Sequence, residues 1–153
     1  VCNLRPESRG HVHITSPDKG AQPEIQPNYL SAEADRRVAA DSIRLTRKLM
    51  ASPAMARFKP EEYLPGPDLT SEDELIKAAG DIGTTIFHPV STCRMGVDEK
   101  SVVDDRLRLR GFENIRVIDA SVMPTITSGN TNAPTVMIAE KGADMIKADR
   151  RAG

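Results

Sequence analysis

The stretch "NTNAPTVMIAEKGADMIKAD", residues 130–149, limits the possible folds more than any other part of the sequence. Asn132 is a natural N-cap and Pro134 lies at or near the first helical position, so we expect a helix to begin here. A helix on the surface of a small domain has a single apolar stripe, whereas this one is apolar on almost every side. The pattern therefore predicts a helix buried against something larger. Its apolar positions are Val136, Met137, Ile138, Ala139, Ala143, Met145 and Ile146.

The length and charge of the chain narrow the classes of partner. With 153 residues, the chain is long enough for one domain with a core of its own. It has 21 basic and 22 acidic residues and no long block of either sign, so we expect neither a nucleic-acid partner nor an anionic membrane surface. The longest apolar run is too short to span a bilayer, so no membrane span is predicted.

The two cysteines and the first residues bear on the origin of the chain. Cys2 and Cys93 are too few for a disulfide framework, which suits a reducing compartment, and we expect a cytoplasmic location. The chain opens with "VCNLRPESRG", without an initiator Met or a signal-like apolar run. We therefore expect a fragment of a longer protein.

The first third of the chain predicts a strand and a helix. In "RGHVHITSPDKG", residues 9–20, apolar and polar side chains alternate as in a half-exposed strand that ends in a turn. Two prolines in "AQPEIQPNYL", residues 21–30, favour an irregular extended connection. An apolar stripe with helical spacing over residues 31–50 predicts an amphipathic helix with Ser31 as its N-cap.

The middle of the chain predicts a loop, a second helix and two strands. Residues 52–70 contain four prolines and favour a loop with short helical pieces. Ser71 and Glu74 have the spacing of a capping box, and Gly80 is expected to end the helix that they begin. "SVVDDRLRLRG" and "NIRVIDAS", on either side of the Gly111 turn, are typical of strands.

The segment "FHPVSTCRMG", residues 87–96, contains the first candidate for chemistry. Taken alone, His88 is weak evidence for catalysis, because a single histidine after an apolar residue is more often a hydrogen-bonded structural side chain. Cys93 would be a poor nucleophile for a His88 base, because nothing nearby orients the imidazole as a third member.

His11, His13 and Glu24 form a further candidate, a metal site. The two histidines merely share one side of a strand, so surface histidines without a metal are expected.

A second candidate lies in "TSGNTNAPT", residues 127–135. Its small polar residues precede the buried helix, whose free N–H groups and positive dipole end suit a negatively charged ligand group. Plain capping by Asn132 is the alternative reading of the same residues. Familiar nucleotide, metalloprotease and hydrolase signatures, such as GxGxxG, the P-loop, HExxH and GxSxG, are absent from the sequence.

Several ordered motifs together resemble one family. "FHPVSTCRMG", "SVVDDRLRLRG" and "NIRVIDASVMPTITSGNTNAPTVMIAEKGADMI" resemble the C-terminal end of the glucose-methanol-choline (GMC) flavoprotein oxidoreductases, on the choline dehydrogenase-like side. "LRPESRGHVHI" and "PNYLS" resemble the start of the same region, so the resemblance covers nearly the whole chain. Thr131 and Ser91 depart from residues common in that family, a proline and a glycine.

The resemblance implies roles for individual residues. His88 matches the histidine that faces the flavin and takes the proton of the substrate hydroxyl, and Asn130 matches its polar partner. Such a base is needed because an alcohol is too weak an acid to lose its proton unaided near neutrality. FAD is the implied cofactor. The residues implied to contact it are Phe87, Thr131 and Asn132 at the ring, with Asp119 and Ala120 where the chain returns to the cofactor domain.

The resemblance also implies a fold and a domain organisation. The expected fold is α+β, an antiparallel sheet with flanking helices. Residues 1–116 would form the substrate-binding domain, and residues 117–153 would supply the terminal strand and helix of an FAD-binding domain whose remainder is absent. The missing domain and a small alcohol are the expected partners, and a homo-oligomer is possible because the terminal helix alone would expose an apolar face.

Two non-catalytic readings stay open at this point. The chain could be a truncated association module with a vestigial site. It could also be a metal-binding module that uses His11, His13 and His88, although we expect no metal. Choline itself is unsupported, since its cation would want aromatic faces or a carboxylate, and the few aromatic residues form no evident cage.

Overall fold

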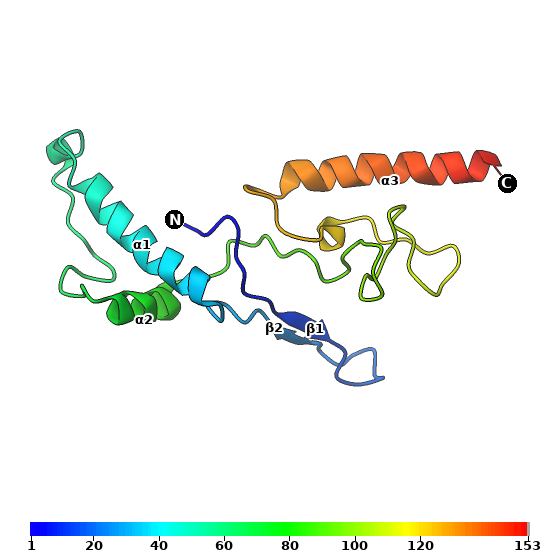
Figure 1. Ribbon diagram of the computed structural model, residues 1–153, viewed down its shortest axis with the longest axis horizontal. Coiled ribbons are helices and arrows are strands. Elements are labelled where there is room, and N and C mark those ends of the chain that lie inside the picture. The colour runs from blue at the N-terminus through cyan, green and yellow to red at the C-terminus, as the bar shows by residue number, and fades with distance from the viewer. Residues whose placement is uncertain (153) are drawn as a thin grey trace. The chain divides into compact units, whose positions relative to one another are not determined.

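The computed structural model describes residues 1–152 and divides into two compact units, residues 1–85 and the chain from residue 86 on. The described residues form helices and a small antiparallel sheet (Figure 1), so the expected α+β class is confirmed. The elements are β1 (His11–His13), β2 (Glu24–Gln26), α1 (Glu33–Met50), η1 (Ala56–Phe58), α2 (Glu72–Ile82), η2 (Ala120–Val122) and α3 (Asn132–Ala152), where η marks a short 3₁₀ helix.

The first unit begins with an antiparallel hairpin. β1 forms where the alternating pattern predicts it, and His13 pairs with Glu24 of β2. The prediction that residues 21–30 are irregular is wrong, because β2 lies among them. Its two prolines, Pro23 and Pro27, flank the strand instead of interrupting it, and a proline beside a short strand removes no ladder hydrogen bond.

Helix α1 starts later than expected and has a different cap. The N-cap is Ala32, with no side-chain cap bond, so the prediction of Ser31 is wrong. The guanidinium of Arg36 instead donates to the carbonyl oxygens of Leu30 and Ser31 at 2.9 and 2.8 Å. The side chain of Arg36 thus fixes the backbone just before the helix. Capping patterns in the sequence do not reveal this contact, because arginine is not a typical N-cap residue.

Asp35 in the first turn of α1 anchors the N-terminal segment. Its side chain is only 4% exposed, and its carboxylate accepts hydrogen bonds from the backbone N–H groups of Glu7 and Ser8 and from the side-chain amide of Asn3. Burial alone would raise the pKa of Asp35, but the hydrogen bonds from Ser8 and Glu7 and the charge of Arg9 hold it below its ordinary value.

Helix α2 packs against α1 and begins as predicted. Ser71 and Glu74 form the complete capping box, with Ser71 Oγ accepting from the Glu74 N–H. Gly80 does not end the helix, which continues to Ile82 with Gly83 as the C-cap. Packing against α1 outweighs the modest helix cost of a glycine. The buried apolar side chains of this unit are Ala40, Leu75 and Ala78.

The proline-rich loop between the two helices contains η1, in agreement with the short helical pieces expected there. Arg47 of α1 holds this loop by donating to Glu62 and to the carbonyl oxygens of Gly66 and Leu69.

The second unit has an apolar core but fewer regular elements than predicted. The expected strands over 101–111 and 114–121 are wrong, since this part of the structure contains only isolated bridges such as Arg108↔Arg116. The Asp104 carboxylate accepts from the N–H groups of Arg106 and Arg108, which bends the chain into a turn where a strand was expected. The core side chains are Val103, Leu107, Val122, Met123 and Ile138.

Residues on both sides of position 116 contribute to this one core. The boundary between 116 and 117 refers to the domains of a longer protein and stays a prediction.

None of the helices in the described part of the chain has the length and apolarity needed to cross a membrane.

Candidate functional site

His88 lies on a loop and is half-buried. Its Nδ1 forms a hydrogen bond with the carbonyl oxygen of Ile86. A carbonyl oxygen can only accept, so this bond assigns the ring proton to Nδ1 and leaves the lone pair of Nε2 free to accept a proton. The short segment around His88 therefore sets the tautomer that a general base needs.

Three hydrogen bonds fix the loop after His88 to the segment around η2. Ser91 Oγ donates to the carbonyl oxygen of Pro124 at 3.2 Å. The N–H groups of Cys93 and Met95 donate to the carbonyl oxygens of Ser121 and Val122 at 3.1 and 2.8 Å. Sequence analysis did not find this pairing, because bonds between backbone groups do not depend on the side-chain types of the two segments.

The pairing brings the histidine loop beside two other predicted site residues, Asp119 and Ala120. Asp119 is the N-cap of η2, and its carboxylate accepts from the N–H and the hydroxyl of Ser121 at 2.8 and 2.5 Å. The side chain of Asp119 thus shapes the turn that Ala120 begins. A contact of either residue with FAD stays a prediction.

The start of α3 differs by one residue from the expectation. The helix already includes Asn132, and the carbonyl oxygen of Thr131 accepts from the Thr135 N–H at 3.0 Å. Thr131 therefore holds the capping position predicted for Asn132, and Pro134 lies within the first turn, where its missing N–H has no cost. Asn130 and Asn132 are exposed, and Thr131 is buried.

These residues fit a flat cofactor with a negatively charged edge. No acidic side chain lies in the first turn of α3, so the helix N-terminus is open to an anionic group. The ring of Phe87 is 81% exposed, and its backbone has a φ of 61°, an uncommon conformation for a bulky residue. An exposed aromatic face and an uncompensated helix end are the kinds of groups that a flavin ring needs.

The arginine of the same motif has a structural contact. The guanidinium of Arg94 forms two hydrogen bonds with the Asp98 carboxylate, at 2.9 and 2.6 Å. Those bonds hold the pKa of Asp98 far below its ordinary value. Arg94 therefore closes the turn that follows the histidine loop, and the motif combines one candidate for chemistry with residues that shape the backbone.

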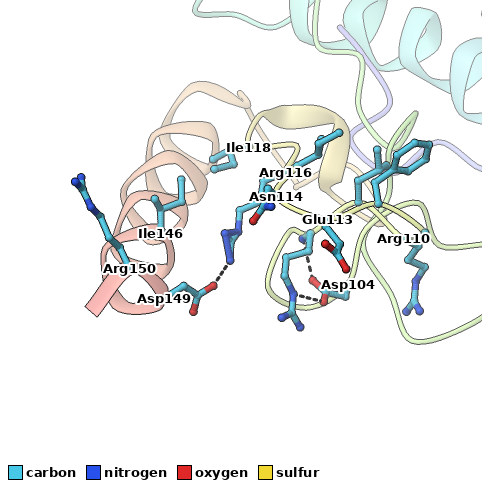
Figure 2. Close-up of a pocket in the computed structure, with 14 residues that line it drawn as sticks. Asp104, Arg110, Glu113, Asn114, Arg116, Ile118, Ile146, Asp149 and Arg150 are labelled. Atoms are coloured by element: carbon cyan, nitrogen blue, oxygen red, sulfur yellow. Dashed lines mark hydrogen bonds and ion pairs between the residues drawn. The ribbon is translucent and has the colours of Figure 1, made fainter. Parts of the chain in front are cut away.

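The second unit also contains a hollow that the predicted site residues do not form. It is lined by parts of residues 104–118 and by the last turns of α3, and none of the predicted site residues lines it (Figure 2). Figure 2 shows Arg116 directed at Asp149. Loss of solvent alone would raise the pKa of Asp149, but its bonds and ion pairs with Arg106 and Arg116 hold that pKa below its ordinary value. The carboxylate in this hollow is already paired with two arginines, so we place the candidate site at the loops and not here.

Known proteins with similar sequences are oxidoreductases. A family model described as GMC oxidoreductase matches residues 6–139. The alcohol dehydrogenase [acceptor] of Pseudomonas putida is 47% identical over 146 residues. The oxygen-dependent choline dehydrogenase of Pseudomonas syringae pv. tomato is 45% identical over 147 residues. The matches cover 95% and 96% of this chain but only 26% of the length of each relative.

Solved structures agree with the sequence comparison. Pyridoxine 4-oxidase from Mesorbium loti superposes with a TM-score of 0.86 at 36% identity, over 92% of this chain and 28% of its own. An FAD-dependent oxidoreductase from Chaetomium thermophilum superposes with a TM-score of 0.91 at 30% identity, over 97% of this chain and 26% of its own. Because the family model spans most of the sequence and these folds agree, the chain belongs to the GMC oxidoreductase family.

Proposed function

We propose that this chain supplies the substrate-binding and catalytic residues of an FAD-dependent alcohol oxidoreductase, with His88 as the general base. The observation that carries the proposal is the hydrogen bond between His88 Nδ1 and the Ile86 carbonyl, since it leaves Nε2 as the acceptor for the hydroxyl proton. A positioned base of this kind contributes roughly 10²–10⁴-fold to a rate.

Asn130 is the proposed polar partner of His88. Its exposed carboxamide lies on the loop that leads into α3, within the same unit as the histidine loop. A carboxamide N–H can donate to the oxygen of the substrate as negative charge develops there, and it can orient the carbon that is oxidised. Asn130 would therefore stabilise the alkoxide while His88 holds the proton.

FAD would be held at Phe87, Thr131 and Asn132, with Asp119 and Ala120 nearby, and when bound it supplies the acceptor for the hydride of the alcohol. The structure supports this assignment through the exposed ring of Phe87 and the open N-terminus of α3. Near that N-terminus, the N–H groups of the first helical turn would stabilise negative charge on a bound group.

The proposed substrate is a primary or secondary alcohol. Two relatives are named for alcohol and choline, but the aromatic residues of this chain come from separate segments, and choline recognition usually needs several aromatic faces together. We therefore propose alcohol oxidation without assigning choline. A cytoplasmic location also remains our prediction.

The exposed apolar side chains of α3 support a partner that packs against the second unit. Ile138 is buried in the core of this unit, whereas Val136 and Met137 are 55% and 59% exposed on the same helix. We propose that this second apolar face packs against the FAD-binding portion of the enzyme. The same exposed face also favours the alternative function, an association module without catalysis, so an experiment must separate the two.

The test combines this chain with the part of the Pseudomonas putida relative that it does not match, as a mixture and as a single chimeric chain. We expect FAD binding in the combination, followed by alcohol-dependent reduction of an artificial electron acceptor. His88→Ala should retain FAD and lower turnover about 10²–10⁴-fold, with partial recovery in added imidazole.

Lys100→Ala, which removes an exposed side chain of the same unit, is the control and should keep full turnover. Equal turnover in wild type and His88→Ala would show that His88 is not the base. A combination that assembles but neither binds FAD nor oxidises any alcohol would establish the association module instead.

A further inference from the structure

The β1–β2 hairpin gathers two imidazoles and a carboxylate on one face. His11 pairs with Gln26, and His13 pairs with Glu24. Side chains two residues apart on a strand share a face, and paired residues of an antiparallel ladder lie on the same face. His11, His13 and Glu24 are therefore neighbours, whereas Val12 and Ile25 point to the other side.

The nitrogen and oxygen atoms of these three side chains are close enough for one ion. The candidate ligand atoms of His11, His13 and Glu24 all lie within 4.8 Å of one another. His11 Nε2 is 3.6 Å from Glu24 Oε2, and the two imidazole rings stack with their centroids 4.3 Å apart. Two ligand atoms of a tetrahedral zinc ion lie about 3.4 Å apart, so a modest rotation of the side chains would complete the site.

This rotation meets little resistance. The side chains of His11 and Glu24 are 40% and 58% exposed, so they can change rotamer without disturbing a packed core. The imidazoles must turn out of their stacked arrangement for their lone pairs to converge. The stacked arrangement of the two rings therefore corresponds to the site without a metal ion.

The backbone beneath the site is fixed at both ends of the hairpin. Thr15 Oγ1 donates to the Gln22 carbonyl at 2.8 Å on the side of the turn. At the opposite end, the side-chain amide of Asn28 donates to the Arg9 carbonyl at 2.9 Å. The register that brings Glu24 across from His13 is thus held by bonds that involve none of the three proposed ligands.

We propose that His11, His13 and Glu24 bind a divalent transition-metal ion of the zinc class, with water completing its coordination. Imidazole nitrogen and carboxylate oxygen are established ligands of zinc, and two histidines with one carboxylate leave a position for solvent. Such an ion would connect β1 to β2 and stabilise the hairpin. The site uses none of the residues proposed for alcohol oxidation, so either proposal can fail without the other.

The sequence favoured surface histidines here, because a pair on a single strand only faces one side. The third ligand lies on β2, a strand that the prolines around it concealed. Glu24 was already a candidate ligand in the sequence, but only the pairing of β1 with β2 shows that it lies on the same face as the two histidines, and this is why the structure leads to a different inference.

The first experiment titrates the chelator-treated 153-residue chain with zinc sulfate and follows the heat of binding and the backbone amide NMR spectrum. We expect one ion per chain, with the largest shifts confined to residues 11–13 and 24–26. Cobalt(II) in place of zinc should give the visible absorption of a site with nitrogen and oxygen ligands. Shifts spread over the acidic side chains of the whole chain, or no saturable binding, would overturn the proposal.

Variants then identify the ligands. His13→Ala and Glu24→Gln should each weaken zinc binding at least about tenfold. His88→Ala and Glu99→Gln remove a histidine and a carboxylate outside the hairpin and should leave binding unchanged. If His13→Ala binds zinc as tightly as wild type, or if His88→Ala loses it equally, the ion is not at this site. The amide spectrum of each apo variant shows whether its hairpin remains folded.

Discussion

A buried carboxylate anchors the N-terminal segment of the first unit, whereas the second unit is organised around a cluster of apolar side chains. Asp35 accepts hydrogen bonds from three residues of the N-terminal segment. In the second unit, Val103 and Val122 are fully buried, and Ile138 joins α3 to them. The first unit buries only a few apolar side chains in its helices, Ala40, Leu75 and Ala78 among the described residues, and its hairpin strands are exposed.

This difference shows why the candidate site lies where it does. The histidine loop is bonded to backbone groups around η2, and Val122 of η2 belongs to the apolar cluster. Asn130 precedes α3, which the same cluster holds through Ile138. The residues proposed for chemistry therefore depend on apolar packing, and the hairpin of the first unit depends on local hydrogen bonds.

The largest effect is expected from a cavity in the second unit. Ile138 is 6% exposed, and Ile138→Ala should lower the free energy of unfolding by about 3 kcal/mol, because it removes buried methyl groups and leaves space behind. Urea unfolding followed by circular dichroism measures the loss. Hydrogen exchange should accelerate in α3 and around η2 while the protection of α1 and α2 is unchanged.

The adjacent residue provides the control. Met137 is 59% exposed on the same helix, so Met137→Ala should change the free energy by no more than about 0.5 kcal/mol. Equal effects of the two variants would mean that α3 does not pack on the cluster through Ile138. Acceleration of exchange in α1 would mean that the loss of packing in the second unit also opens the first unit.

The second effect concerns the carboxylate of the first unit. Asp35→Asn should cost about 2 kcal/mol, because the amide keeps one acceptor but turns an NH₂ group toward backbone donors. Asp68→Asn, on an exposed loop, should cost almost nothing. Exchange of the Glu7 and Ser8 amides, followed by NMR, reports the loss directly.

The stabilisation that Asp35→Asn removes should also depend on pH. The pKa of Asp35 is lowered in the folded state, so the unfolded chain binds more protons in the interval below its ordinary value of about 3.9. The stabilisation is fully present above that value and is lost as the pH falls through the folded pKa. The difference between wild type and Asp35→Asn should thus be complete at pH 7 and shrink below about pH 4. A difference that persists unchanged at pH 2 would show that the charge of Asp35 is not what stabilises the segment.

Local signals in the sequence predicted the helices better than the strands. The capping box at Ser71 and the helical spacing of α3 depend on neighbours within one or two turns, and the capping box and the presence of the helix were both confirmed. β2 was missed because its pairing depends on a distant strand, and the strands near Leu107 were overpredicted because alternation does not reveal a side-chain bond such as that of Asp104.

The sequence proposed residues for the candidate site, and their roles stay a prediction, whereas it gave no information on their arrangement. The motif around His88 identified the histidine, and the family comparison supports the resemblance on which its role depends. The tautomer set by Ile86 and the contact between Ser91 and Pro124 came only from the structure. Both depend on backbone carbonyls, which every residue type supplies equally.

The smallest effect compares one glycine in a helix of each unit. Gly142 of α3 is buried, and a Cβ at this position would lie 2.6 Å from Cγ2 of Ile118. Gly80 of α2 has only Leu30 Cδ1 near the same position, at 3.8 Å, which is ordinary contact. Alanine favours a helix over glycine by about 1 kcal/mol at either site, and overpacking costs about 1–3 kcal/mol where space is lacking.

Gly142→Ala should therefore destabilise the chain by about 1 kcal/mol, whereas Gly80→Ala should stabilise it by up to about 1 kcal/mol. Thermal unfolding of both variants beside wild type shows which of them is stabilised and which is destabilised. Adding Ile118→Val, which shortens the opposing side chain but keeps its Cγ2, should recover little of the stability that Gly142→Ala loses. If Gly142→Ala instead raises the melting temperature, Ile118 moves aside readily, and the close approach of α3 to residue 118 does not limit packing in the second unit. The opposite signs follow because one helix packs tightly on an apolar layer while the other leaves its glycine at the surface.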